Sequence, residues 1–115
     1  MLIIRKQQEA RFSQAALMNF EDRMVQFTRR FFPEMQQELG EDRVRALIHQ
    51  GISKSATYGI VRECDVARYI TLMFSLRPDF DSHPETSWTR SVLTESSVSA
   101  EERLEIIYRR ASSEH

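Results

Sequence analysis

Three side chains with metal-binding chemistry alternate in one short stretch of the sequence. Asp79, Asp81 and His83 lie between two prolines, and a divalent ion can use their carboxylate and imidazole groups. A calcium-binding loop, however, requires more ligands at fixed offsets, a central glycine and a closing glutamate, none of which occur here. The stretch therefore favours a solvated loop whose polar groups cap turns, and we predict no bound metal and no other cofactor.

A second possible chemistry is nucleophilic catalysis by Cys64, the only cysteine in the chain. Cys64 lies where a helix is expected to begin, a position at which a thiol can be activated. A thiol nucleophile also needs an oriented base, and the sensible partners are His49 and His83. Because His49 has no partner at a catalytic spacing, Cys64 is interpreted as merely a small side chain, and we predict that the protein is not an enzyme. A small metal- or thiol-dependent enzyme is the alternative that these residues leave open.

Arginines concentrate near the first expected turn between helices: Arg23, Arg29, Arg30, Arg43 and Arg45. Such a cluster can bind phosphate or an acidic partner. Acidic residues are interspersed among these arginines, and the whole chain has 16 basic against 17 acidic residues, a formal net charge of -1. This balance does not provide the positive field that attracts nucleic acids, so we predict a mixed-charge surface and no nucleic-acid partner. A nucleic-acid regulator is kept as a further alternative.

The length of 115 residues suits one helical domain, assigned to residues 1–115 with an N-terminal arm at 1–5 and a frayed tail at 113–115. A single cysteine excludes an internal disulfide and favours a reducing compartment, so the predicted location is the cytoplasm. The segment from Met1 to Ile4 has too few apolar residues for a signal-peptide core or a membrane span. No membrane association is expected.

Helices must position these residues, and the longest helix is expected near the start of the chain. Apolar residues at steps of three or four predict one helix over residues 6–32, and they are Phe12, Ala16, Phe20, Met24, Phe27 and Phe31. This helix would be about 40 Å long, comparable to the diameter of the domain, so the other helices would have to pack along it. Pro33 ends it, because proline cannot continue the hydrogen-bond ladder.

Further helices are expected over residues 33–39, 41–58, 63–76, 85–93 and from 99 onward. Gly40 closes the first of these, and Ser99 with Glu102 has the spacing of a capping box at the start of the last. Gly51 costs about 1 kcal/mol of helix propensity, which a close approach of a neighbouring helix would offset. The sequence thus predicts an all-α fold, a single-domain irregular bundle of five to six helices around the long N-terminal helix. We expect the helix at 63–76 beside that helix in the centre of the core.

Aromatic residues at element ends are the best candidates for a binding surface. Phe31, Phe32, Phe80 and Trp88 lie at helix ends or in the loop, where complete burial is harder than in the middle of a helix. Packing in the core is the other interpretation of these aromatics. The predicted partner-binding residues are these four, as anchors, and four neighbouring charged residues that set orientation: Arg29, Arg30, Asp79 and Asp81.

Five segments of the chain together resemble a family of small bacterial helical proteins encoded in gene clusters for type VI secretion spikes and their toxic effectors. They are NFEDRMV at 19–25, RRFFPE at 29–34, YGI at 58–60, DVARYITLMF at 65–74 and PDFD at 78–81. The resemblance implies a non-enzymatic protein-interaction module, an adaptor or chaperone-like accessory that holds a secretion effector or a spike protein. An immunity protein that neutralises a co-encoded toxin is the alternative. A homodimer formed through an exposed part of the first helix is compatible with either role.

Overall fold

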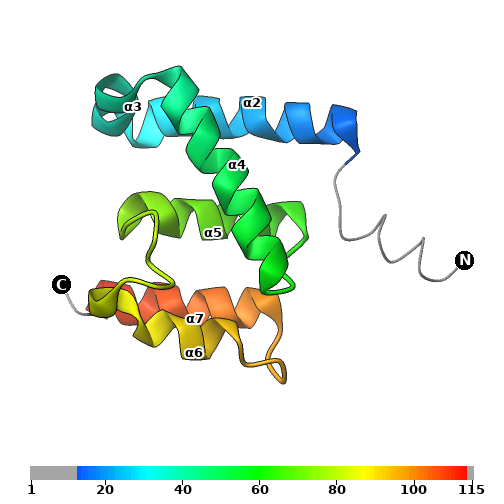
Figure 1. Ribbon diagram of the computed structural model, residues 1–115, viewed down its shortest axis with the longest axis vertical. Coiled ribbons are helices and arrows are strands. Elements are labelled where there is room, and N and C mark those ends of the chain that lie inside the picture. The colour runs from blue at the N-terminus through cyan, green and yellow to red at the C-terminus, as the bar shows by residue number, and fades with distance from the viewer. Residues whose placement is uncertain (1–12, 114–115) are drawn as a thin grey trace, which may run out of the picture.

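The computed structural model describes residues 13–113, and this part of the chain is helical without any strand (Figure 1). The elements are α2 (Gln14–Phe31), α3 (Pro33–Leu39), α4 (Glu41–Thr57), α5 (Glu63–Ser75), the 3-10 helix η1 (Pro84–Thr86), α6 (Trp88–Leu93) and α7 (Ala100–Ser113). The prediction of an all-α bundle in a single domain is confirmed.

α2 is the longest helix of the described residues, but it is shorter than predicted. It has 18 residues and begins directly after Ser13, whose backbone is extended and whose hydroxyl accepts a hydrogen bond from the backbone N–H of Ala16 at 3.1 Å. Ser13 is therefore an N-cap, the position at which a helix starts. The predicted continuous helix over 6–32 is wrong for this reason. The predicted arm at 1–5 and the apolar residue Phe12 lie outside the described residues.

Local breakers end α2 and α3 where the sequence predicted. The backbone of Phe32 leaves the helical region, and Pro33 starts α3. Gly40 separates α3 from α4 with a φ of 86°, a left-handed conformation that favours glycine. Because these signals act over a few residues, the predicted limits of the helices at 33–39 and 41–58 agree with α3 and α4 to within one residue.

The helices form three tiers in the view of Figure 1. α2 and α3 lie at one end, α5 lies in the middle, and α6 and α7 lie at the other end, while α4 crosses in front of α2 and α5. α4 contacts α2, α3 and α5, and α5 also contacts α7. The helix at 63–76 is therefore central, as predicted. α2, which was also expected at the centre, lies at one end because it buries only one face.

The largest buried side chains come from α2, α4, α5, α6, α7 and the loop after α5. They include Phe20, Ile48, Tyr69, Ile70, Met73, Phe80, Leu93, Leu104 and Ile107. Gly51 brings α4 close to α5: a Cβ atom at this position would lie 2.5 Å from Cγ1 of Ile70 and 2.9 Å from the sulfur of Met73. The close helix approach predicted for Gly51 is confirmed.

The C-terminal part of the chain differs from its prediction in two details. The single helix expected over 85–93 is divided into η1 and α6. α7 begins after Ser99, whose hydroxyl accepts a hydrogen bond from the backbone N–H of Glu102 at 3.2 Å, as the capping-box spacing predicted. α7 is helical through Ser113, so residue 113 does not belong to a frayed tail.

Candidate interaction surface

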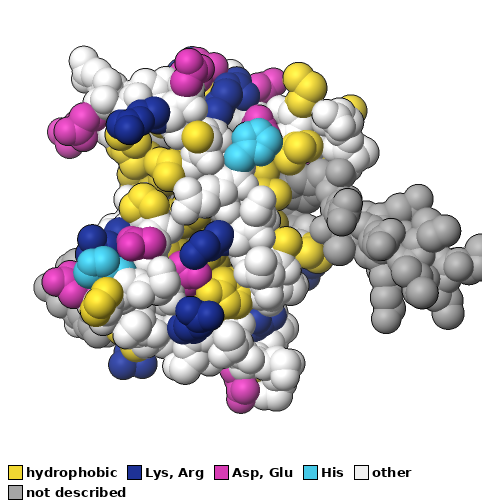
Figure 2. Space-filling model, in the orientation of Figure 1, with side chains coloured by type: hydrophobic (Ala, Val, Ile, Leu, Met, Phe, Trp, Pro, Cys, Tyr) yellow, Lys and Arg dark blue, Asp and Glu magenta, His cyan; other side chains and the backbone are white. Residues whose placement is uncertain are grey.

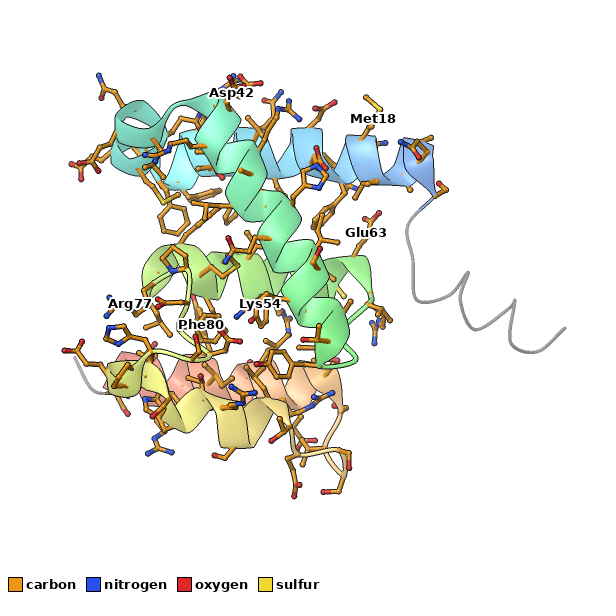
Figure 3. All side chains as sticks on the ribbon, in the orientation of Figure 1. Met18, Asp42, Lys54, Glu63, Arg77 and Phe80 are labelled. Atoms are coloured by element: carbon orange, nitrogen blue, oxygen red, sulfur yellow. The ribbon has the colours of Figure 1, made fainter. Side chains whose placement is uncertain are left out.

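The eight predicted contact residues fall in three separate places. Arg29, Arg30, Phe31 and Phe32 lie at the C-terminal end of α2, Asp79, Phe80 and Asp81 in the loop between α5 and η1, and Trp88 at the start of α6. Figure 3 shows Phe80 in the half of the molecule that holds α6 and α7, away from α2. The eight residues therefore do not form one surface, and each group has to be judged on its own burial and contacts.

Phe31 is the most exposed phenylalanine of the described residues, with 59% of its surface accessible. The ring of Phe27 lies 4.8 Å from it between centroids, and the guanidinium of Arg30 lies 5.5 Å from its centroid. An exposed cation–π contact of this kind contributes about 0.5–1 kcal/mol. These two neighbours hold an apolar ring at the surface of the protein.

Phe31 belongs to an open groove of about 520 Å³ along α2. Within residues 13–113 its lining comes from α2: Arg23, Gln26, Phe27, Arg29, Arg30 and Phe31. We call this set the α2 patch. Among the described residues this lining contains three arginines and no carboxylate, so the charged side chains of the α2 patch all have one sign.

Two of the three arginines are paired with carboxylates that lie outside the α2 patch. Arg29 Nη2 lies 2.6 Å from Oε1 of Glu41, and Arg23 Nη2 lies 2.8 Å from Oε1 of Glu63. Arg30 is exposed and makes no ion pair with any residue in the range 13–113. Arg30 is therefore the cation of the α2 patch that is available to a partner.

Phe32 joins the α2 patch to the core. It is half-buried, and its ring lies 6.2 Å from that of Phe27 and 5.6 Å, in an edge-on arrangement, from that of Phe74 on α5. Edge-to-face pairs at such distances stabilise packing. Phe32 therefore lies between Phe27 and Phe74, whereas Phe31 is exposed to solvent.

A second groove, of about 290 Å³, lies between α5 and α7. Its lining contains Arg68 and Glu105 as well as the exposed Tyr108, so it presents both signs of charge. Glu105 also pairs with Arg109 at 3.4 Å. This groove was not predicted from the sequence, and it lacks the one-sided charge of the α2 patch.

Asp81 is an internal residue, and the prediction that it contacts a partner is wrong. Its side chain is 4% exposed; Lys54 Nζ donates to both of its carboxylate oxygens at 2.9 Å, and the hydroxyl of Tyr58 donates to Oδ2 at 2.6 Å. Burial disfavours the charged carboxylate, but these hydrogen bonds outweigh it, so the pKa of Asp81 lies below its ordinary value. Burial, together with the hydrogen bond to Asp81, raises the pKa of Tyr58 to about 12.

Phe80 is also a core residue, and its predicted contact role is wrong for the same reason. The loop after α5 folds back so that Phe80 is fully buried, with its ring 5.0 Å from that of Tyr69. Its neighbour Asp79 is exposed and accepts a hydrogen bond from Arg77 at 3.2 Å. The guanidinium of Arg110 on α7 lies over the half-buried ring of Trp88, 4.4 Å from the ring centroid. The loop and Trp88 thus contribute mainly to packing within the molecule.

Arg103 is a buried charge that the sequence analysis missed. Its guanidinium donates to the carbonyl oxygen of Tyr58 at 3.0 Å, to that of Ser99 at 3.4 Å, and to that of Leu93. Tyr58 caps the end of α4 and Leu93 is the last residue of α6, so the positive charge lies at the negative ends of two helices. No local pattern could reveal these contacts, because Arg103 and Tyr58 are 45 positions apart in the sequence.

The geometry does not assemble a catalytic pair from the residues considered in the sequence. The sulfur of Cys64 lies 3.7 Å from Nη2 of Arg62, whereas His49 pairs with Glu21 on α2 and His83 accepts a hydrogen bond from the backbone of its own loop. Within residues 13–113, no group of three His, Cys, Asp or Glu side chains is placed to hold a metal ion. Neither thiol chemistry nor metal chemistry therefore receives support from these contacts.

Acidic and basic side chains are interspersed on the face shown in Figure 2. Arg45 donates to Asp22 at 2.8 Å and to Glu41 at 3.1 Å, and these hydrogen bonds raise the pKa of Arg45 above its ordinary value. Arg23 and Arg29 are ion-paired in the same way. The mixed-charge surface predicted for the arginine cluster is confirmed at these three arginines.

Comparisons of the chain with protein-family models, with curated proteins and with solved structures found no match. In the described part of the chain, none of the helices combines the length and the apolar character needed to cross a bilayer.

Proposed function

We propose that the protein is a non-enzymatic interaction module, an adaptor or chaperone-like accessory that binds a type VI secretion effector or spike protein in the bacterial cytoplasm. The observation that carries this proposal is the 59% exposure of Phe31 beside Arg30 at the end of α2. Aromatic and arginine side chains are enriched among the residues that dominate binding energy at protein interfaces. Two of the five segments that resemble the secretion-associated family, 19–25 and 29–34, contribute residues to the α2 patch. This overlap supports the choice of partner.

The proposal is tested by affinity purification of the tagged protein from a lysate of its own organism, followed by quantitative mass spectrometry. The wild type should retain a secretion effector or spike protein in stoichiometric amount, and Phe31→Asp should lose it, because a charge would replace the anchoring ring. Met18→Asp is the matched control, since Met18 is 61% exposed and lies on the same helix outside the α2 patch. Recovery of the same proteins with wild type and Phe31→Asp would contradict the proposal.

A further inference from the structure

We infer that the α2 patch binds a protein segment that presents an apolar or aromatic side chain next to a carboxylate. This inference rests on the proposed function and names the chemistry of its partner. It follows from two features of the patch, an apolar ring pair and a cation without a counter-ion within the described range.

The apolar feature is the pair of rings of Phe27 and Phe31. Their centroids are 4.8 Å apart and their planes are tilted by 41°, so the pair presents ring faces and edges to the groove of about 520 Å³. Phe27 is half-buried and is backed by Phe32, whereas Phe31 is exposed. One apolar side chain of a partner can therefore remove the most exposed phenylalanine from water without any change in the core.

The charged feature is Arg30. Its guanidinium carbon lies over the ring of Phe31, 5.5 Å from the ring centroid, and Arg30 makes no ion pair within residues 13–113, so its N–H groups can donate to a partner. A carboxylate accepts two parallel hydrogen bonds from such a group. Arg23 and Arg29 are held by Glu63 and Glu41, so they contribute positive potential but fewer free donors.

A single-stranded nucleic acid is the other class of ligand that aromatic and arginine side chains bind, by base stacking and phosphate contacts. Such binding uses a positively charged groove that follows the strand. Because Arg29 and Arg23 are paired, Arg30 is the one arginine of the α2 patch that has no ion-pair partner within residues 13–113. The formal net charge of the chain is -1, so no wider positive field adds to it. The observations thus favour an acidic protein segment.

The test is a titration of the ¹⁵N-labelled protein, followed by two-dimensional NMR, with three defined probes. The first is a synthetic peptide with one phenylalanine flanked on both sides by glutamates, the second is the same peptide with lysines in place of the glutamates, and the third is a short oligothymidylate. The inference predicts that the glutamate peptide shifts amide signals of residues 26–31 more strongly than the other probes do. It also predicts that the shifts weaken as salt is raised, because charges at an exposed site are screened.

Variants separate the two features. Phe31→Ala should weaken binding of the glutamate peptide at least about tenfold, whereas Met18→Ala, at similar exposure on the same helix, should leave it unchanged. Arg30→Glu should abolish binding of the glutamate peptide and create binding of the lysine peptide, because it reverses the charge beside the same ring. All three substitutions are at exposed positions, and thermal unfolding of each variant verifies that it is folded.

Equal or stronger binding of the lysine peptide or of oligothymidylate to the wild type would overturn the inference, and so would the absence of signal shifts with all three probes. These outcomes differ from a failure of the proposed function, which is the recovery of the same proteins by wild type and Phe31→Asp from the lysate. A secretion partner that depends on Phe31 but binds Arg30→Glu as well as it binds the wild type would retain the proposed function and reject the acidic segment.

Discussion

At the scale of single residues, whether a charged side chain of this protein is buried or exposed depends on partners that are distant in the sequence. Asp79 and Asp81 are two positions apart in the same loop, yet Asp79 is exposed and Asp81 is buried. The difference arises because Lys54 of α4 and Tyr58, the C-cap of α4, donate hydrogen bonds to the carboxylate of Asp81. A buried carboxylate without such donors would be strongly unfavourable.

The ion pair of Asp81 makes stability depend on pH. Because the pKa of Asp81 is lowered in the folded state, its ionised form stabilises the protein above the unfolded-state pKa of about 4, and this contribution is lost as the pH falls through the folded-state pKa. Asp81→Asn should therefore lower the free energy of unfolding by about 2 kcal/mol at neutral pH, and the deficit should shrink at about pH 3. Urea denaturation at both pH values measures this. Asp79→Asn is the control and should change little; a deficit of Asp81→Asn that is equal at both pH values would contradict the assignment.

At the scale of helices, boundaries could be predicted from the sequence and contacts could not. Pro33, Gly40 and Ser99 act on their immediate neighbours, so the limits they set were found correctly. The start of α2 was missed because the apolar repeat continues through Ser13, and Ala16 offers no capping-box side chain to mark it.

In the candidate site, too, the position of a residue in its helix could be predicted from the sequence, and its tertiary contacts could not. The sequence predicted a binding surface at the end of α2, because complete burial is harder for phenylalanines at the end of a helix than for those in its middle. It could not distinguish the exposed Phe31 from the buried Phe80, since burial of Phe80 depends on how the loop folds onto Tyr69. The half-burial of Phe32 likewise depends on Phe74, which belongs to another helix. Such contacts are not encoded by local periodicity.

The close packing of α4 on α5 predicts how a methyl group added at Gly51 would change the stability of the protein. Gly51→Ala would improve helix propensity by about 1 kcal/mol, but its Cβ would meet Ile70 and Met73 at 2.5 and 2.9 Å. Overpacking of a close helix contact costs about 1–3 kcal/mol, so we expect net destabilisation measured by urea denaturation. Ser53→Ala, at an exposed position of the same helix, should be neutral or stabilising. A stabilised Gly51→Ala variant would show that the helices separate without cost.

The N-cap of α7 predicts a local effect on a helix that covers α5 and α6. Ser99→Ala removes the acceptor for the backbone N–H of Glu102 and should lower the free energy of unfolding by about 1 kcal/mol. Ser99→Gly should cost only a few tenths of that, because glycine tolerates the N-cap backbone and exposes it to water. Hydrogen exchange of the amides at 100–103 should be faster in Ser99→Ala. Ser97→Ala, in the exposed link before the cap, is the control, and equal exchange in both variants would contradict the role of Ser99.

At the scale of the whole molecule, Tyr58 connects two charged clusters that come from different parts of the chain. Its hydroxyl donates to Asp81, which also binds Lys54, and its carbonyl oxygen accepts from Arg103. Arg103 in turn donates to the carbonyl oxygen of Leu93. The end of α4, the loop after α5, the end of α6 and α7 are therefore joined through Tyr58 and Arg103.

This connection predicts that the two clusters stabilise the fold cooperatively. Tyr58→Phe removes the bond to Asp81, and Arg103→Met removes the bonds to the carbonyl oxygens; we expect each to cost about 2 kcal/mol. Because both variants loosen the same end of α4, the double variant should lose less than the sum of the single losses, by about 0.5 kcal/mol or more. Urea denaturation of the wild type, the two single variants and the double variant measures this difference.

As a control, Tyr58→Phe combined with Ser13→Ala, which removes the N-cap of α2 at the other end of the molecule, should be additive. Additivity in both pairs would show that the clusters are independent, and coupling only in the first pair would establish Tyr58 as the link between the two clusters.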